Sequence, residues 1–137
     1  MPTRRFAYRL GRRSWPVLRL FGVRGHQDAW VDVDDTTFTA RFGRFEASTP
    51  VDNIRSWRIE GPWRWITAIG VRRSIRHADL TFGGSPHGGV RLDFREPIRV
   101  TFLDVPALYV TVEDLEGLAA ELTARGISGT DARTKRP

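Results

Sequence analysis

Residues 78–94 read Ala-Asp-Leu-Thr-Phe-Gly-Gly-Ser-Pro-His-Gly-Gly-Val-Arg-Leu-Asp-Phe and give a clear indication of the fold. Apolar and polar residues alternate at both ends of this stretch, in 78–82 and in 90–94. Alternation with a period of two is typical of β-strands that bury one face. The glycine-rich segment 83–89 between them favours a loop. The sequence therefore predicts two strands joined as a hairpin.

A second hairpin is predicted upstream of this stretch. Residues 30–33 (Trp-Val-Asp-Val) are followed by Asp-Asp at 34–35, a pair that tolerates the left-handed conformations of tight turns. In the segment 36–42, Phe38, Ala40 and Phe42 share one face, and threonine and arginine occupy the other. This pattern indicates a hairpin with one buried and one wet face.

Shorter alternating segments predict further strands on both sides of these hairpins. Glycine and proline punctuate them at Gly61-Pro62, Pro97 and Pro106. Many short strands separated by regular turn signals are typical of a β-sandwich or a β-barrel. The segments concerned are 4–10, 44–49, 53–60, 66–71, 99–103 and 108–112.

One helix is predicted near the C-terminus, at 113–125. Leu115, Leu118, Ala119 and Leu122 recur at i, i+3, i+4 and i+7, and residues 111–114 (Thr-Val-Glu-Asp) resemble a capping box. The apolar stripe of this helix must pack on a sheet or cap one end of a barrel. The predicted fold class is therefore mainly β, an antiparallel barrel or sandwich with one C-terminal α-helix packed on it or capping it.

The length of 137 residues favours a single domain, predicted at 1–127. Within it, residues 1–28 form a basic N-terminal segment and residues 29–125 form the core. Residues 128–137 are rich in small and charged residues and are predicted to be a disordered tail.

Composition excludes several classes of site. The chain has no cysteine, so disulfides, thiol catalysis and cysteine-zinc sites are absent. No apolar run approaches the roughly 20 residues of a membrane helix. Arg12-Arg13 faintly resembles a twin-arginine export signal, but Arg19 interrupts the apolar stretch that follows. A cytoplasmic location is therefore expected.

The formal net charge of +6 is distributed unevenly along the chain. Two basic segments, 1–27 and 61–103, alternate with two acidic ones, 28–60 and 104–137. A protein that coats nucleic acid would carry a more uniform positive charge, and no nucleic-acid-binding motif is present, so nucleic acid is the less favoured partner.

Part of this pattern resembles the bacterial pleckstrin-homology-like (PH-like) domains. The resemblance rests on the hairpin 31–43, on Thr49-Pro50 with Ile54 after it, and on a final strand that runs into a helix at 112–115. It covers residues 29–125 and implies a β-barrel capped by a C-terminal helix, a fold used for lipid, peptide or oligomerisation contacts. No site residue is carried over from it. The chain also resembles actinobacterial proteins, a likeness that implies no function.

The sequence contains few residues that could form a catalytic site. His26, His77 and His87 lack the close spacing of a metal site. Ser85, His87 and Asp93 could form a catalytic trio, but Ser85 lacks the Gly-x-Ser-x-Gly elbow. The glycine-rich loop lacks the lysine and the following helix of a phosphate-binding P-loop. The sequence therefore favours a protein that is not an enzyme, with no catalytic, cofactor-binding or metal-binding residue and no cofactor.

Three of the five tryptophans, Trp57, Trp63 and Trp65, lie close together beside a run of arginines. These rings can be core packing residues, or they can form an exposed aromatic platform surrounded by positive charge. A platform of that kind suits an anionic membrane surface or another polyanion. The candidate binding residues are Trp63, Arg64, Trp65, Arg72, Arg73 and Arg76.

The leading hypothesis is a binding module that meets an acidic protein or an anionic membrane surface through this arginine and tryptophan face. The alternative is a carrier of a small apolar ligand with a hollow barrel. Four phenylalanines of one strand parity could line such a cavity or fill a solid core. They are Phe38, Phe42, Phe82 and Phe94.

Overall fold

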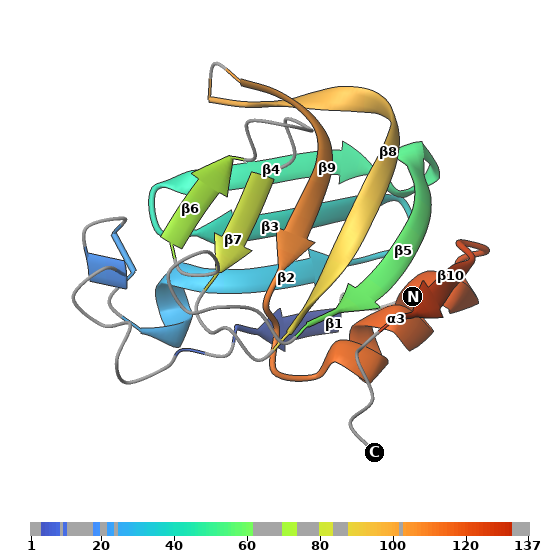
Figure 1. Ribbon diagram of the computed structural model, residues 1–137, viewed down its shortest axis with the longest axis horizontal. Coiled ribbons are helices and arrows are strands. Elements are labelled where there is room, and N and C mark those ends of the chain that lie inside the picture. Colours follow the sequence, from blue (N-terminus) through green and yellow to red (C-terminus); the bar gives the residue numbers. More distant parts are fainter. Residues whose placement is uncertain are drawn as a thin grey trace.

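The computed structural model describes residues 4–8, 10, 18–19, 22–23, 25–61, 70–73, 80–83, 88–101 and 103–132. These residues form two β-sheets in layers, with the helix α3 (Leu115–Ala124) at one side (Figure 1). The first sheet is antiparallel and contains, in spatial order, β1 (Arg4–Ala7), β2 (Ala29–Val33), β3 (Thr37–Phe42) and β4 (Phe45–Pro50). A short 3-10 helix, η2 (His26–Asp28), precedes β2.

The second sheet is mixed and has six strands. Its spatial order is β10 (Gly129–Asp131), β5 (Ile54–Glu60), β8 (Gly89–Val100), β9 (Leu103–Val110), β7 (Leu80–Gly83) and β6 (Gly70–Arg73). The pairs β10–β5 and β7–β9 are parallel, and the other pairs are antiparallel. The 3-10 helix η3 (Val51–Asn53) leads from the first sheet into the second.

The mainly β fold with a C-terminal helix is confirmed, and the described strands form a sandwich instead of a closed barrel. Strands of the second sheet cross those of the first at a steep angle (Figure 1). The two sheets meet at one end through a β-bridge between Tyr8 and Val112. Beside it, the backbone N–H of Glu113 donates to the carbonyl of Ala7 at 2.9 Å.

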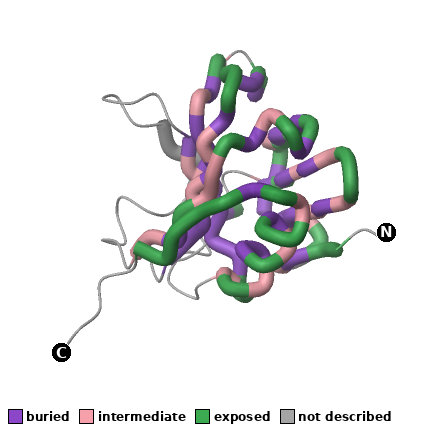
Figure 2. The backbone as a smooth tube through the Cα atoms, turned by 90° about the vertical axis from the view of Figure 1, so that its right-hand side faces the viewer, coloured by how far each residue is buried: buried purple, intermediate pink, exposed green. Residues whose placement is uncertain are grey.

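The core lies between the two sheets and follows the predicted alternation. Phe38, Ala40 and Phe42 of β3 are fully buried, whereas Thr37, Thr39 and Arg41 are not. Phe42 stacks on Phe82 of the opposite sheet, with ring centroids 5.8 Å apart. Buried stretches of backbone run through the interior and exposed ones gather at turns (Figure 2). Two of the four phenylalanines considered for a hollow barrel, Phe42 and Phe82, therefore pack against each other.

The predicted hairpin between 78–82 and 90–94 is wrong. Both segments are strands, β7 and β8, but β9 lies between them, antiparallel to β8 and parallel to β7. Alternation identifies a strand and its buried face without identifying its neighbour. Here the apolar strand β9 pairs with both, and the chain crosses over from β7 to β8 through the glycine-rich segment. Residues 84–87 of that segment lie outside the described residues.

Two strands contain irregularities that the sequence pattern left unexplained. Ile54 is out of phase with Trp57 and Ile59, yet it is buried, because a β-bulge between Ile54 and Ser56 shifts the register of β5. A second shift in β8, between Asp93 and Ile98, accommodates Pro97 within the strand. Pro97 and Pro106 therefore lie inside β8 and β9 instead of bracketing a separate strand, and β9 ends at Val110.

The helix forms where it was predicted but begins differently. Asp114 is the N-cap, and its carboxylate accepts a hydrogen bond of 2.9 Å from the N–H of Gly117. The predicted capping box is therefore wrong, because Thr111 is buried before the helix starts. Leu118, Ala119 and Leu122 are buried as expected, and α3 packs against β5 and β8.

The prediction of a disordered tail from residue 128 is wrong for residues 129–131. They form β10, which pairs in parallel with Trp57, Arg58 and Ile59. Every residue of β10 is exposed, so main-chain pairing holds the strand without an apolar signal in the sequence. The rest of the predicted tail, 133–137, lies outside the described residues.

Candidate binding groove

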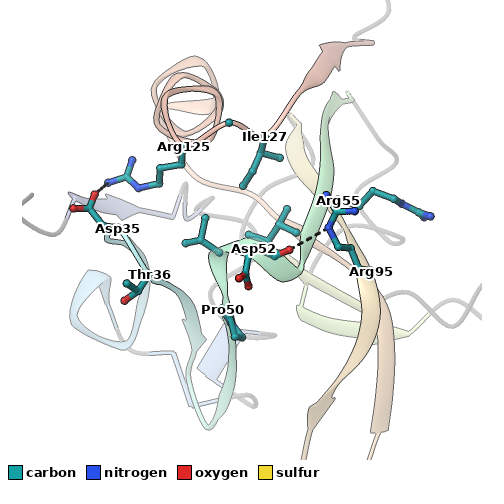
Figure 3. Close-up of a pocket in the computed structure, with 11 residues that line it drawn as sticks. Asp35, Thr36, Pro50, Asp52, Arg55, Arg95, Arg125 and Ile127 are labelled. Carbon is teal, nitrogen blue, oxygen red and sulfur yellow. Dashed lines mark hydrogen bonds and ion pairs between the residues drawn. The ribbon is translucent and has the colours of Figure 1, made fainter.

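Two adjoining clefts lie beside η3, where the chain passes from one sheet to the other. The first has a volume of about 520 Å³ and lies between η3, the first residues of β5 and residues 125–127, which follow α3 (Figure 3). The second, of about 570 Å³, extends along β8. They share Pro50, Asp52 and Arg95, and we call the two together the arginine groove.

Hydrogen bonds fix η3 to both sheets and so shape the groove. The N–H of Val51 donates to the carbonyl of Thr36 at 2.9 Å. Asn53 forms a reciprocal pair with the backbone of Glu96 in β8, in which its amide nitrogen donates to the carbonyl and its amide oxygen accepts from the N–H, both at 3.0 Å. A short helix held at several points in this way gives a pre-formed site, which lowers the entropy cost of binding.

The floor of the first cleft is apolar and its rim is charged. Val51, Ile54 and Ile127 line it and are buried, with exposed fractions of 6%, 1% and 6%. Arg55 and Arg95 lie on one side, and Asp35 and Arg125 lie on the other (Figure 3). An apolar floor with a few polar groups around it is the usual composition of a binding site.

Arg125 forms one wall of the groove and is a structural residue. Its Nε donates to the carbonyl of Asp34 at 2.8 Å, and its Nη1 donates to the carboxylate of Glu121 at 2.6 Å. Its Nη2 lies 3.8 Å from a carboxylate oxygen of Asp35. The side chain is only 5% exposed, and two acidic neighbours compensate its charge. Arg125 therefore connects α3 to the turn between β2 and β3 and contributes little free positive charge.

Arg55 and Arg95 line the first cleft without an ion pair to any described residue, although the exposed acids Asp52 and Glu96 also line the groove. Both arginines are exposed, and the side chain of Arg55 has no hydrogen bond or ion pair with any part of the chain that the structure describes. Arg95 donates from Nε to the carbonyl of Asp52 at 3.1 Å, which orients the guanidinium and leaves its outer nitrogens without a partner in the described parts of the chain. Arg99 lies four residues further along β8, about 13 Å away on an extended strand, in an exposed ion pair of 3.7 Å with Asp104. Exposed pairs of this kind are weak.

Most of the binding face predicted from sequence cannot be placed. Trp63, Arg64, Trp65 and Arg76 lie outside the described residues. Arg72 and Arg73 belong to β6, where the register aligns Arg72 with Thr81 and Arg73 with Leu80. Trp57, in contrast, is half-buried and packs against the core, in agreement with a packing role.

The described residues do not support a catalytic site formed by the groups considered from the sequence. Ser85, His77 and His87 lie outside the described residues, and of His26 only the backbone is described. Asp93 accepts a hydrogen bond of 3.0 Å from Nε of Arg91, its neighbour two residues earlier on β8. Among the described residues, no group of three or more histidine or acidic side chains could hold a metal ion.

Sequence reasoning missed Arg55, Arg95 and Arg99 as a group. They come from two strands, and only the fold brings Arg55 beside Arg95, through the pairing of Ile54 with Phe94. The one available signal was weak. Arg95 and Arg99 share a strand parity around Pro97, in a segment where four of five residues are exposed.

No helix in the described parts of the chain is long and apolar enough to cross a membrane. Comparison of the chain with protein-family models, with curated proteins and with solved structures found no match. The resemblance to PH-like domains therefore stays a prediction.

Proposed function

We propose that this protein is a non-enzymatic binding module that recognises an acidic segment of a partner protein in the arginine groove. The observation that carries the proposal is the pair Arg55 and Arg95, two exposed arginines that line the same cleft and form no ion pair with any described residue. Carboxylates are the natural ligands of such groups, because guanidinium nitrogens match both oxygens of a carboxylate.

The shape of the site supports an extended ligand. The two clefts adjoin at Arg95 and continue to Arg99, so the positive charges follow the direction of β8. An extended peptide could place one acidic side chain at Arg55 and Arg95 and another at Arg99. An apolar side chain next to the first acidic one could rest on the floor of the first cleft, formed by Val51 and Ile54. A cytoplasmic location is part of this proposal.

The alternative of a small apolar-ligand carrier has less support. Such a carrier needs an enclosed apolar cavity. The stacking of Phe42 on Phe82 fills the space between the sheets at that point. Phe42 also lies 5.1 Å from the ring of Tyr8, measured between centroids.

Fluorescence anisotropy with a short glutamate-rich peptide tests the proposal, with its glutamine counterpart as the control ligand. We expect the glutamate peptide to bind and the affinity to fall with salt, because exposed charges are screened over about 8 Å at physiological ionic strength. The double variant Arg55→Glu with Arg95→Glu should weaken binding at least about tenfold, since two attractions of up to about 1 kcal/mol become repulsions. The matched variant Arg41→Glu changes an exposed arginine on the first sheet and should bind normally.

Further measurements distinguish the arginine groove from other possible binding surfaces. If the protein sediments with phosphatidylserine vesicles and binds no peptide, its partner is an anionic membrane and not an acidic protein. Loss of peptide binding in Arg72→Glu with Arg73→Glu, but not in the groove variant, would move the site to the face predicted from sequence. Equal binding of the glutamate and glutamine peptides would overturn the electrostatic basis of the proposal.

A further inference from the structure

The outer edge of β5 is covered by the chain's own C-terminal segment, residues 127–132. The N–H of Trp57 donates to the carbonyl of Ser128 at 3.2 Å, and the N–H of Ala132 donates to the carbonyl of Ile59 at 2.8 Å. Between these two bonds, β10 runs parallel to β5 with Gly129 opposite Trp57. The unpaired N–H and C=O groups of an edge strand are a template for a further strand, and this segment occupies that template.

The C-terminal segment holds its place with few side-chain contacts. Ile127 is buried, but residues 128–132 are all exposed. Main-chain hydrogen bonds at Ser128 and Ala132, together with an interaction of Asp131, attach the segment beyond Ile127. A segment with exposed hydrogen bonds and little buried apolar surface belongs to the least stable part of a fold and opens locally.

Trp57 gives this edge a sequence preference. A Cβ atom added to Gly129 would collide with the indole ring and with the backbone carbonyl of Trp57. The indole Nε1–H of Trp57 donates to the carbonyl of Ile127 at 3.0 Å. The edge thus requires a glycine opposite Trp57 and a carbonyl two residues before it. A hollow of about 260 Å³ beside the pair, lined by Ser56, Arg58, Asp93 and Thr130 among others, leaves room for larger neighbouring side chains.

We propose that the β5 edge is a peptide-binding site, which accepts an extended segment of a partner protein parallel to β5 with glycine opposite Trp57. Residues 127–132 act as its internal ligand. Addition of a strand to a sheet edge is a general mode of peptide recognition, in which main-chain bonds supply affinity and side-chain positions supply specificity. This site shares Ile127 with the floor of the arginine groove but uses none of its arginines, so it does not rest on the function proposed for that groove.

The internal ligand makes the site self-blocked. A tethered segment competes at an effective concentration in the millimolar range, so an external peptide of the same sequence binds only after the segment has left. A natural partner would prevail through side chains that fill the hollow, which residues 128–132 do not do.

The test uses the full chain with Gly129→Val, which prevents the C-terminal segment from seating. The probe is the peptide Ile-Ser-Gly-Thr-Asp-Ala, the sequence of residues 127–132, and the control peptide has valine in place of its glycine. The readout is the NMR signals of the Trp57 backbone N–H and indole Nε1–H. We expect these signals to shift in the variant, and the glycine peptide to return them toward their wild-type positions in a saturable manner. The valine peptide should leave them unchanged, and wild-type protein should bind the glycine peptide at least about tenfold more weakly.

Each other outcome counts against the proposal. Unshifted Trp57 signals in the variant would show that valine is tolerated opposite Trp57. Shifted signals that no peptide restores, or equal binding of both peptides, would show that the edge is no selective site. If Gly129→Val does not fold, Thr130→Pro takes its place in the same titration, because proline removes one main-chain N–H from the segment. Failure of both variants to fold would make the segment an integral strand and would overturn the proposal.

Discussion

The guanidinium of Arg125, just after α3, donates a hydrogen bond of 2.8 Å from Nε to the backbone carbonyl of Asp34, in the turn between β2 and β3. The helix packs on β5 and β8 of the second sheet, so this bond fastens it to the first sheet as well. Arg4 of β1 adds an ion pair of 3.2 Å to Glu121 of the same helix. The helix therefore joins the two layers at the side of the sandwich where the arginine groove opens.

We expect Arg125→Ala to lower the free energy of unfolding by about 2 kcal/mol, because hydrogen bonds of a charged, buried group are lost. Arg125→Lys should restore little of it, since a lysine cannot reproduce the forked donors. The matched control is Arg99→Ala, whose ion pair is exposed and whose loss should cost less than about 0.5 kcal/mol. Urea denaturation measures all three variants. An Arg125→Ala variant as stable as the control would contradict the structural role.

Tyr8 is fully buried, and its hydroxyl has no hydrogen-bond partner among the described residues. Burial of an unpaired hydroxyl costs about 1–3 kcal/mol. Tyr8→Phe removes the hydroxyl and keeps the ring contact with Phe42. The variant should therefore be at least as stable as the wild type in thermal denaturation. A clear decrease in the melting temperature would mean that the hydroxyl has a partner in solution.

Stability should decrease in alkaline solution because of the two tyrosines. Burial raises the pKa of Tyr8 well above its usual value, and burial also raises the pKa of Tyr109 to about 12. Above the unfolded value of about 10, the folded state holds phenol protons that the unfolded state has released, so rising pH favours unfolding. Urea denaturation between about pH 9 and pH 12 measures this slope, which should be shallower in Tyr8→Phe. Equal slopes would contradict the burial of an un-ionised Tyr8.

Leu118 is fully buried under α3, so Leu118→Ala should lower the free energy of unfolding by about 2–5 kcal/mol. Thr123→Ala, at an exposed position of the same helix, should change it by less than about 0.5 kcal/mol. Chemical denaturation of both variants makes the comparison. Similar stabilities would show that the helix does not dock through this leucine.

Some elements are determined by residues close together in the sequence, and these elements could be predicted from the sequence. The alternation around Phe38 and Phe42 predicted both the strand and its buried face, and the aspartates at 34–35 predicted the turn. In the structure the carboxylate of Asp34 accepts hydrogen bonds from the N–H groups of Thr36 and Thr37, which lower its pKa. The spacing of Leu118 and Leu122 predicted the helix, because residues four positions apart lie on the same face of neighbouring helical turns.

Strand pairing and the binding groove could not be predicted in this way. The separation of β7 from β8 depends on β9, which competes for both edges although it follows them in the chain. β10 was not predicted, because its exposed side chains carry no hydrophobic pattern. Arg55 and Arg95 are ordinary exposed residues when taken singly, and forty residues separate them in the sequence. Their significance depends on a pairing of β5 with β8 that sequence periodicity does not determine.

The most direct test of the central claim is reversal of the ligand charge in the arginine groove. Isothermal titration calorimetry of wild-type protein should show binding of a glutamate-rich peptide and none of a lysine-rich peptide of the same length. The variant Arg55→Glu with Arg95→Glu should lose the first and gain the second, because its groove then carries those two glutamates and Asp52. If the variant still binds the glutamate-rich peptide as the wild type does, the arginine groove is not the binding site and the proposed function is wrong.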